Sequence, residues 1–273
     1  MLALFDGVRL TPSQRRIAQC LLERGARAAY LSSGEVAELA RVSQPSVTRF
    51  AMALGYPGYP GLRKAIRDLG EPDPAHPVDN ELQDAVRGEV ATLARLADRL
   101  ADGTGERSAV ADAAKLLSGS RPLPVLGLRA AAPVAGYFGY FAAKIHPDVR
   151  VLDQGGTLLT DRLEQARAAG ATAMLAVVLP RYPREALDAL RDARTAGLSV
   201  VVLTDSPVSP AAEFADAVLT AAVGSRLVFD LQAGPMALAM VLLQAICDIE
   251  PAQSLARLEE FEASAARRGV FVA

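Results

Sequence analysis

The chain has 273 residues, of which 51% are hydrophobic and 22% are charged, so disorder is excluded as the default and one large domain or two ordinary ones can be built. No apolar run reaches the roughly eighteen residues of a membrane helix, and the first residues lack the pattern of a secretory signal. We therefore expect a soluble, cytoplasmic protein with no membrane partner.

The two cysteines, Cys20 and Cys247, lie far apart, and each falls inside an apolar helical pattern. This spacing indicates buried thiols, because a disulfide framework or a metal or redox site would need more cysteines or a closer pair. We accordingly predict no metal and no cofactor.

The formal net charge of -2 is distributed unevenly along the chain. Residues 1–70 carry ten positive and five negative side chains, a net charge of +5, whereas residues 71–273 carry nineteen positive and twenty-six negative ones, a net charge of -7. A basic first part followed by an acidic body suits a protein that meets phosphate groups at one end only.

The composition changes between residues 72 and 77, where three prolines forbid a continuous helix. We interpret residues 71–79 as a linker. Residues 1–70 contain helical patterns and no strand-like run. After the linker, residues 80–101 show the apolar spacing of an amphipathic helix, and we interpret residues 80–107 as a connecting segment that contains it.

Residues 108–273 alternate between short apolar runs and helical patterns. The runs fall at 123–128, 149–152, 173–179, 199–204 and 217–222, and the helical stretches lie near 108–118, 131–145, 157–169, 184–196 and 228–247. Such alternation predicts a parallel sheet covered by helices on both faces. The fold class is therefore α/β: an N-terminal all-α domain, followed by a doubly wound, five-stranded parallel sheet.

Two short helices separated by a tight turn are predicted within residues 33–55. Ser33 is expected to cap the first helix and Ser43 the second, which tolerates Pro45 in its first turn. Residues 41–42 form the turn, and Gly55 ends the second helix. This is the geometry of a helix-turn-helix, whose second helix enters the major groove of DNA.

Five polar residues at the start of the second helix are the candidates for DNA contact: Ser43, Gln44, Ser46, Thr48 and Arg49. Glutamine and arginine can make paired hydrogen bonds to adenine and guanine, and Ser43 with nearby backbone N–H groups can hold a phosphate. The alternative is that these are solvated residues of an ordinary helical hairpin. The basic charge of residues 1–70 favours DNA binding.

The same part of the chain carries a longer pattern of spaced residues. Its members are Ser43, Ser46, Val47, Arg49, Phe50, Leu54, Gly55, Gly58, Tyr59, Leu62 and Arg63. With this spacing, residues 10–67 resemble the N-terminal domain of RpiR-type transcriptional regulators. The resemblance implies a double-stranded DNA operator as partner, and a C-terminal sugar isomerase (SIS) domain with a five-stranded parallel sheet.

The loops after the strands are where such a sheet binds its ligand. Residues 204–210 are similar to the T-D-S-x-x-S-P element of the family, but the loops after the first and third strands lack the serines that bind a sugar phosphate. They offer Arg129, Arg181 and Arg184 instead. Because guanidinium groups bind phosphate and carboxylate well, we expect a small anionic effector, a sugar phosphate or an organic acid, at these arginines with Thr204 and Ser206. Alternatively, the arginines are solvated or paired with neighbouring carboxylates.

The alternative function is a phosphosugar isomerase or lyase, because the SIS fold also houses enzymes. Isomerisation needs a general base against the substrate carbon. His76 falls in the linker, and His146 precedes a proline at a helix end, where a capping or surface role is expected. Among the loops at the sheet edge, only Asp153 and Asp205 carry carboxylates. We therefore predict no catalytic residue. A third alternative is a pure oligomerisation scaffold.

A homodimer or homotetramer is expected, because a two-fold protein matches the two half-sites of a palindromic operator. The candidate contact surfaces are the amphipathic helix at 80–101 and the apolar helix at 227–247. Packing against the core is the alternative explanation for their apolar residues.

Overall fold

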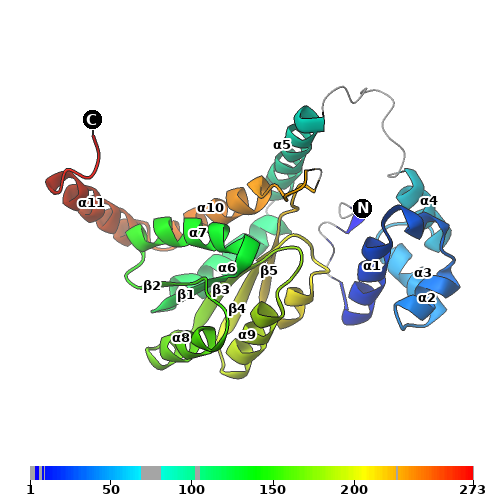
Figure 1. Cartoon of the computed structure of the whole chain (residues 1–273), viewed down its shortest axis with the longest axis horizontal. Coiled ribbons are helices and arrows are strands. Elements are labelled where there is room, and N and C mark those ends of the chain that lie inside the picture. The colour runs from blue at the N-terminus through cyan, green and yellow to red at the C-terminus, as the bar shows by residue number, and fades with distance from the viewer. Residues whose placement is uncertain are drawn as a thin grey trace.

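The computed structural model describes residues 4, 5, 8, 10–68, 81–101, 105–225 and 227–272. The predicted linker, 71–79, and its residue His76 lie outside the described residues. The N-terminal part consists of helices that pack into one body (Figure 1): α1 (Pro12–Arg24), the 3-10 helix η2 (Gly25–Tyr30), α2 (Ser33–Leu39), α3 (Gln44–Ala53) and α4 (Tyr59–Asp68).

The core of this N-terminal body joins α1, α2 and α3. Ile17, Val36, Val47 and Phe50 are fully buried in it, and they come from the apolar positions of three different helices. Tyr59, at the start of α4, donates a hydrogen bond from its hydroxyl to the backbone oxygen of Leu31 at 3.0 Å. Its burial raises the pKa of this hydroxyl to about 12. The predicted pair of short helices is thus held by a shared apolar core.

The second part of the chain is a parallel sheet between two layers of helices (Figure 1). The strands are β1 (Leu123–Gly127), β2 (Val149–Leu152), β3 (Ala173–Val178), β4 (Ser199–Thr204) and β5 (Ala217–Thr220), in the order β2-β1-β3-β4-β5. The helices are α5 (Glu81–Ala101), α6 (Glu106–Ser118), α7 (Ala132–Ile145), α8 (Thr157–Ala168), α9 (Arg184–Thr195), α10 (Ala233–Cys247) and α11 (Pro251–Arg267), with the 3-10 helices η3 (Arg129–Ala131) and η4 (Pro210–Phe214). The predicted fold class is confirmed.

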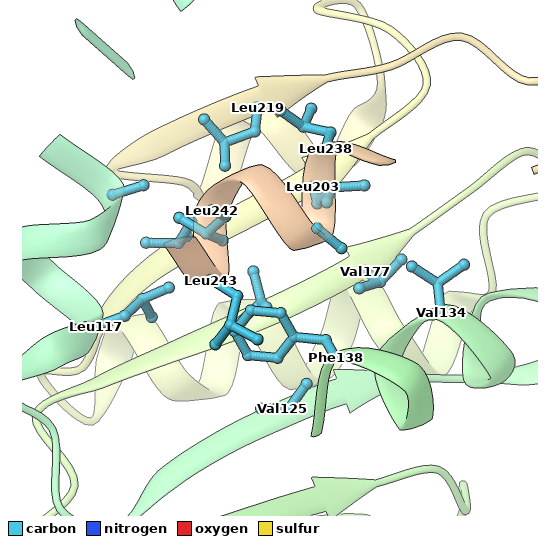
Figure 2. Packing of buried hydrophobic residues seen from close by; sticks show 14 of the residues in the cluster. Leu117, Val125, Val134, Phe138, Val177, Leu203, Leu219, Leu238, Leu242 and Leu243 are labelled. Atoms are coloured by element: carbon cyan, nitrogen blue, oxygen red, sulfur yellow. The ribbon is translucent and has the colours of Figure 1, made fainter. Parts of the chain in front are cut away.

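Each face of the sheet has its own apolar cluster, because successive strand residues point to opposite faces. Helices α6, α7 and α10 cover one face, where Phe138 packs among Val125, Leu203 and Leu242 (Figure 2). Helices α8 and α9 cover the other face. Burial of one such leucine contributes roughly 1.5–3 kcal/mol, so the two clusters account for most of what holds the layers together.

Three elements differ from the sequence prediction. The helix predicted near 228–247 begins only at Ala233, because Gly224 and Leu231 exchange two backbone hydrogen bonds, of 2.9 and 2.8 Å, that a helix could not make. The helix predicted near 108–118 begins earlier, because α6 starts at Glu106, inside the predicted connecting segment 80–107. Helix α11 was not predicted at all.

In the described part of the chain, no single helix is long and apolar enough to cross a membrane. Helices α10 and α11 together have the length and apolar composition of a membrane-spanning segment, but they are bent by 111° relative to each other. The apolar residues of α10, such as Leu238 and Leu242, are buried against the sheet. This burial accounts for part of the apolar character of the helix predicted at 227–247, as the alternative of core packing implies.

Candidate functional site

Helix α2 begins with a capping box at Ser32, not at the predicted Ser33. The Ser32 hydroxyl accepts a hydrogen bond from the Glu35 backbone N–H at 3.2 Å, and the Glu35 carboxylate accepts one from the Ser32 N–H at 2.7 Å. The hydrogen bond that the Glu35 carboxylate accepts from the Ser32 backbone lowers the pKa of Glu35, and an interaction with the Ser32 hydroxyl lowers it further. Ser33 is the first helical residue, and its hydroxyl accepts a hydrogen bond from Gln44 Nε2 at 2.9 Å, which ties α3 to α2.

The turn between α2 and α3 is tight, as predicted. Arg41 has a φ of 51°, in the left-handed region that few residues other than glycine adopt. The Val42 N–H donates to the Ala37 oxygen at 2.9 Å, so the chain reverses within one turn. Phe50 and Val47 of α3 then pack beneath α1 and α2. Together these contacts fix the direction of α3.

Helix α3 presents its polar residues to solvent. Ser43, Gln44, Thr48 and Arg49 are exposed, and Ser46 is half-buried. Ser43 is the N-cap residue, but its hydroxyl bonds to the Ser46 hydroxyl at 2.8 Å rather than to a backbone N–H group. Arg49 donates to the same Ser46 hydroxyl at 3.3 Å. All of these bonds lie at the surface, where a DNA backbone or base edge can replace them.

One exposed residue of α3 was missed by the sequence prediction. Met52 is 61% exposed on the outer side of the helix. Its signal in the sequence was weak, because an apolar residue inside a helical pattern is usually assigned to the core. An exposed thioether can contact the methyl group of a thymine, as other apolar side chains do.

The effector edge, which we define as the loops that follow β1, β3 and β4, lies at the carboxyl ends of parallel strands. β1 is hydrogen-bonded to both β2 and β3, so the chain changes direction of winding between β1 and β3. Ligands of open α/β sheets bind at such a switch point. The neighbouring strand ends carry η3 with Arg129, and the loop with Arg181 before α9. Two of the three predicted arginines therefore flank the switch point.

The side chains of the three arginines are exposed, and within the described part of the chain none of them forms a salt bridge. Arg129 and Arg181 have φ values of 53° and 63°, and residues other than glycine adopt this conformation mostly where surrounding structure enforces it. Arg184 is the first residue of α9. Two of the expected competing carboxylates are occupied elsewhere: Asp188 pairs with Arg191 at 2.7 Å, and Asp205 accepts from a tyrosine.

Thr204 and Ser206 do not extend the arginine cluster as predicted. Both are buried, with exposed fractions of 0% and 1%. The Thr204 hydroxyl donates to the Val178 backbone oxygen at 2.7 Å, and the Ser206 hydroxyl accepts from the Val208 N–H at 3.3 Å. Both hydroxyls thus brace the loop after β4. The family-like sequence of residues 204–210 forms the shape of this loop instead of offering free hydroxyls to a ligand.

A buried tyrosine–aspartate pair, missed from the sequence, joins two loops of the effector edge. The Tyr182 hydroxyl donates to Asp205 Oδ1 at 2.9 Å. Asp205 is 6% exposed, and burial raises the pKa of its carboxyl group. Burial also raises the pKa of the Tyr182 hydroxyl. The pair fixes the loop that carries Arg181 against the loop that follows β4.

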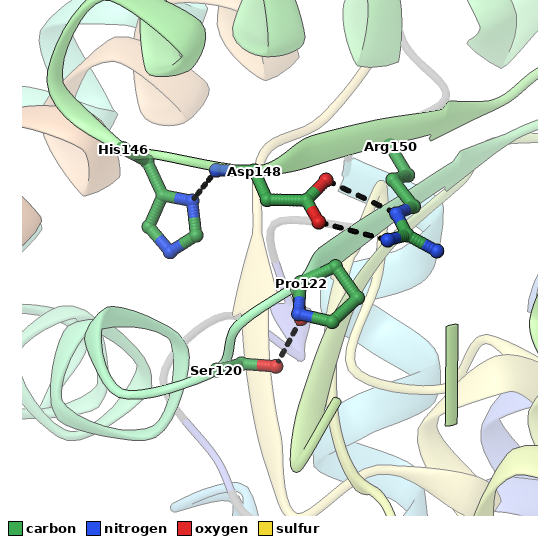
Figure 3. Close-up of polar contacts among 5 residues, drawn as sticks. All are labelled: Ser120, Pro122, His146, Asp148 and Arg150. Atoms are coloured by element: carbon green, nitrogen blue, oxygen red, sulfur yellow. Dashed lines mark hydrogen bonds and ion pairs between the residues drawn. The ribbon is translucent and has the colours of Figure 1, made fainter. Parts of the chain in front are cut away.

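His146 lies at the opposite, amino-terminal edge of the sheet, just before β2 (Figure 3). It is the C-cap residue of α7, as one of the two expected roles requires, but it is 6% exposed, so the expected surface role is wrong. Its Nδ1 accepts a hydrogen bond from the Asp148 N–H at 3.3 Å. Burial lowers the pKa of the ring. Asp148 in turn accepts two hydrogen bonds from Arg150, at 3.0 and 2.8 Å. This cluster is remote from the effector edge and orders the start of β2.

Comparison with known proteins agrees with this geometry. Residues 6–69 match the helix-turn-helix domain of the rpiR family. A stretch of 77 residues is 38% identical to an uncharacterized HTH-type transcriptional regulator, YfhH, of Escherichia coli K12. The match covers 27% of each chain, so the chain aligns with about a quarter of that relative's length.

Two solved structures resemble larger parts of the chain. The sugar isomerase domain of an RpiR transcription factor from Sphaerobacter thermophilus is 28% identical, with a TM-score of 0.59, and the match covers 66% of this chain and 97% of that domain. The Vibrio vulnificus NanR protein, solved in complex with ManNAc-6P, is 19% identical with a TM-score of 0.60, and the match covers 94% of each chain.

The capped helix pair, the exposed polar face of α3 and these matches lead to one assignment. The chain carries an N-terminal helix-turn-helix domain of the rpiR family, followed by an α/β domain with the sugar isomerase fold of an RpiR-type transcription factor.

Proposed function

We propose that the chain is a transcriptional regulator that binds duplex DNA through α3 and acts in the cytoplasm. The observation that carries this proposal is the exposed polar face of α3, which is held by the Gln44–Ser33 hydrogen bond, the left-handed turn at Arg41 and the apolar core beneath the helix. The basic charge of residues 1–70 supplies the attraction to phosphate that all DNA binding needs. The test is selection of bound fragments from genomic or random DNA by the purified protein, followed by sequencing. Recovery of a recurrent, two-fold symmetric motif supports the proposal, and recovery of unenriched DNA contradicts it.

We further propose that DNA affinity is controlled by a small anionic metabolite, a sugar phosphate or an organic acid, at the effector edge. Arg129 and Arg181 flank the switch point of the sheet, Arg184 opens α9, and the starts of α7 and α9 lack side-chain caps. Uncapped backbone N–H groups and guanidinium groups together favour an anion. The complex of NanR with ManNAc-6P, a protein of similar fold, supports a phosphorylated sugar.

A double variant tests the effector site. Arg181→Ala with Arg184→Ala should weaken binding of a sugar phosphate or organic acid at least about tenfold, because each charge-assisted hydrogen bond is worth about 1.5–3 kcal/mol. The loss is measured by titrating ManNAc-6P, or another member of a metabolite panel, and following the melting temperature. The double variant should need a higher concentration than the wild type for the same rise. Arg191→Ala is the matched control, because Arg191 lies on the same helix but pairs with Asp188. An unchanged response of the double variant places the ligand elsewhere.

The three residues that the sequence offered as general bases do not support the isomerase alternative. The Asp205 carboxylate is buried and accepts a hydrogen bond from Tyr182, and Asp153 is exposed to solvent. His146 lies at the other edge of the sheet. A general base must lie within hydrogen-bond reach of the substrate, and none of these side chains is placed for that role.

We propose that the regulator is a homodimer or homotetramer that uses α5 as a contact surface. Leu82, Val86 and Val90 are spaced four residues apart and are 68%, 60% and 62% exposed, so they form one apolar stripe on the helix. A contiguous apolar stripe at a surface marks an interaction site. A two-fold arrangement would present two α3 helices to the two halves of an operator.

A further inference from the structure

The loop that follows β4 contacts the helix-turn-helix domain directly. Val208, at the middle of this loop, is 4% exposed and belongs to the apolar cluster that forms the core of the N-terminal domain. All other members of that cluster come from residues 4–66. The α/β domain therefore contributes one apolar side chain to the surface of the DNA-binding domain, and α1 is the N-terminal helix that faces the α/β domain (Figure 1).

The seam between the two domains is only partly filled. A pocket of about 380 Å³ that is open to solvent lies there, lined by Cys20 and Leu39 on one side and by Val208 and Pro210 on the other. Charged residues also line it: Arg15, Arg16, Glu23, Arg41 and Glu213. Apolar contacts are lost wherever a gap separates the two surfaces. The described apolar contact between the two domains is thus one buried valine beside an open pocket, so separating them removes a single α/β-domain side chain from the N-terminal core.

The other end of the same loop is tied to the effector edge. Asp205 accepts the hydrogen bond from Tyr182, the residue that follows Arg181, and the Thr204 hydroxyl is bonded to the end of β3. Ser206 accepts from the Val208 N–H, so the backbone between the aspartate and the valine is braced as well. A short series of hydrogen bonds thus connects the arginine loop to the backbone at Val208.

We propose that the loop 205–210 is the joint through which the effector edge controls the DNA-binding domain, with Val208 as the contact residue and Tyr182 as the positioning residue. This inference rests on the proposed function of that edge. An anion that draws the arginine loop into a new position changes the free energy of the docked arrangement, and only such a difference between states can couple the two sites. The position of α3 relative to the sheet then depends on whether the edge is occupied.

The two native cysteines allow a direct test on the full chain. Cys20 lines the seam and is buried, whereas Cys247 lies in α10, away from it. Val208→Asp should open the seam and accelerate the modification of Cys20 by a thiol reagent about fivefold or more, with no change at Cys247. Val208→Thr, which keeps the shape of the side chain, should give a smaller acceleration. Val272→Asp, at a valine that is 98% exposed, is the matched control.

A Cys20 rate that is unchanged in both Val208 variants overturns the inference. If Val208→Asp accelerates both cysteines, the variant is unfolding, and Val208→Thr then decides: selective acceleration of Cys20 supports the joint, and none overturns it.

Coupling is tested with ManNAc-6P as the probe, at concentrations that raise the melting temperature. In the wild-type protein the probe should change the Cys20 rate at least about twofold. Tyr182→Phe keeps the ring but loses the bond to Asp205, so the probe should no longer alter the Cys20 rate at concentrations that still raise the melting temperature of the variant. Binding of the probe without any effect on wild-type Cys20 overturns the joint but leaves the effector site standing. If the probe does not bind, the effector proposal is contradicted for this probe. The Val208 variants then still test the contact between the loop 205–210 and the helix-turn-helix domain.

Discussion

At the scale of single residues, Gly127 allows β1 to pass closely beneath α7. A Cβ atom at this position would lie 2.5 Å from the Cβ of Ala135 and 2.8 Å from the backbone oxygen of Ala131. Gly127→Ala should therefore lower the free energy of unfolding by about 1–3 kcal/mol, because the backbone cannot move aside as a flexible side chain could. Urea denaturation measures this change.

Gly136 supplies the control for this substitution. It lies inside α7, and a Cβ there meets nothing within 4 Å. Gly136→Ala should stabilise the protein by about 0.5–1 kcal/mol, since alanine loses less backbone entropy in a helix. Equal stability of Gly127→Ala and the wild type would show that β1 and α7 are not so close.

Asp205 makes the free energy of unfolding depend on pH, and the direction of this dependence follows from the shift of its pKa. Burial raises the pKa of its carboxyl group in the folded state above the ordinary value of 3.8, so the folded protein holds the proton more tightly than the unfolded chain. The stabilisation that Asp205 contributes is fully present at pH values below its ordinary pKa. It is lost as the pH rises through the raised pKa of the folded state. Asp205→Asn keeps an oxygen acceptor for Tyr182 but cannot ionise. The melting temperature of the variant minus that of the wild type should therefore increase as the pH is raised from about 4 to about 7. A difference that stays constant over this range would contradict the assignment.

At the scale of elements, the strands were predictable and several caps and loops were not. Every strand begins at the residue where its apolar run begins, because a strand covered on both faces needs a continuous run of apolar side chains. Ser32 and Ser33 are chemically alike, and only the reciprocal bond with Glu35 selects Ser32 as the cap. Thr204 ends β4 and Ser206 follows it, at a sheet edge where the sequence predicts exposed side chains, whereas tertiary packing buries both. Helix α11 is largely exposed, so its apolar pattern is weak.

The apolar stripe of α5 makes a prediction about assembly. Val86→Glu places a charge in the centre of the stripe formed with Leu82 and Val90, and a buried, unpaired charge is strongly unfavourable. The variant should dissociate into smaller species at micromolar concentration, as measured by light scattering. Leu158→Glu is the control, because Leu158 is 41% exposed on α8, remote from α5 in the fold. A variant with the mass of the wild type would exclude the stripe as the contact.

At the scale of the whole molecule, the short loop after β4 lies between the effector edge and the helix-turn-helix domain. The helix-turn-helix and the sheet could each be predicted from local patterns, because caps, turns and apolar periods are local properties. The contact of Val208 with the N-terminal core could not, since it joins residues separated by more than a hundred positions and depends on how two finished domains meet. The Tyr182–Asp205 pair escaped prediction for the same reason.

The central claim is that α3 contacts DNA bases, and Arg49 tests it most directly. On an operator obtained by selection, at fixed salt concentration, Arg49→Ala should weaken binding by about 1–3 kcal/mol, or roughly five- to 150-fold in the dissociation constant, because it removes a side chain able to bind guanine. Arg107→Ala, which removes an exposed arginine at the start of α6, should leave the affinity unchanged. Fluorescence anisotropy measures both. Operator affinity equal to that of the wild type in Arg49→Ala and in Gln44→Ala alike would contradict the account.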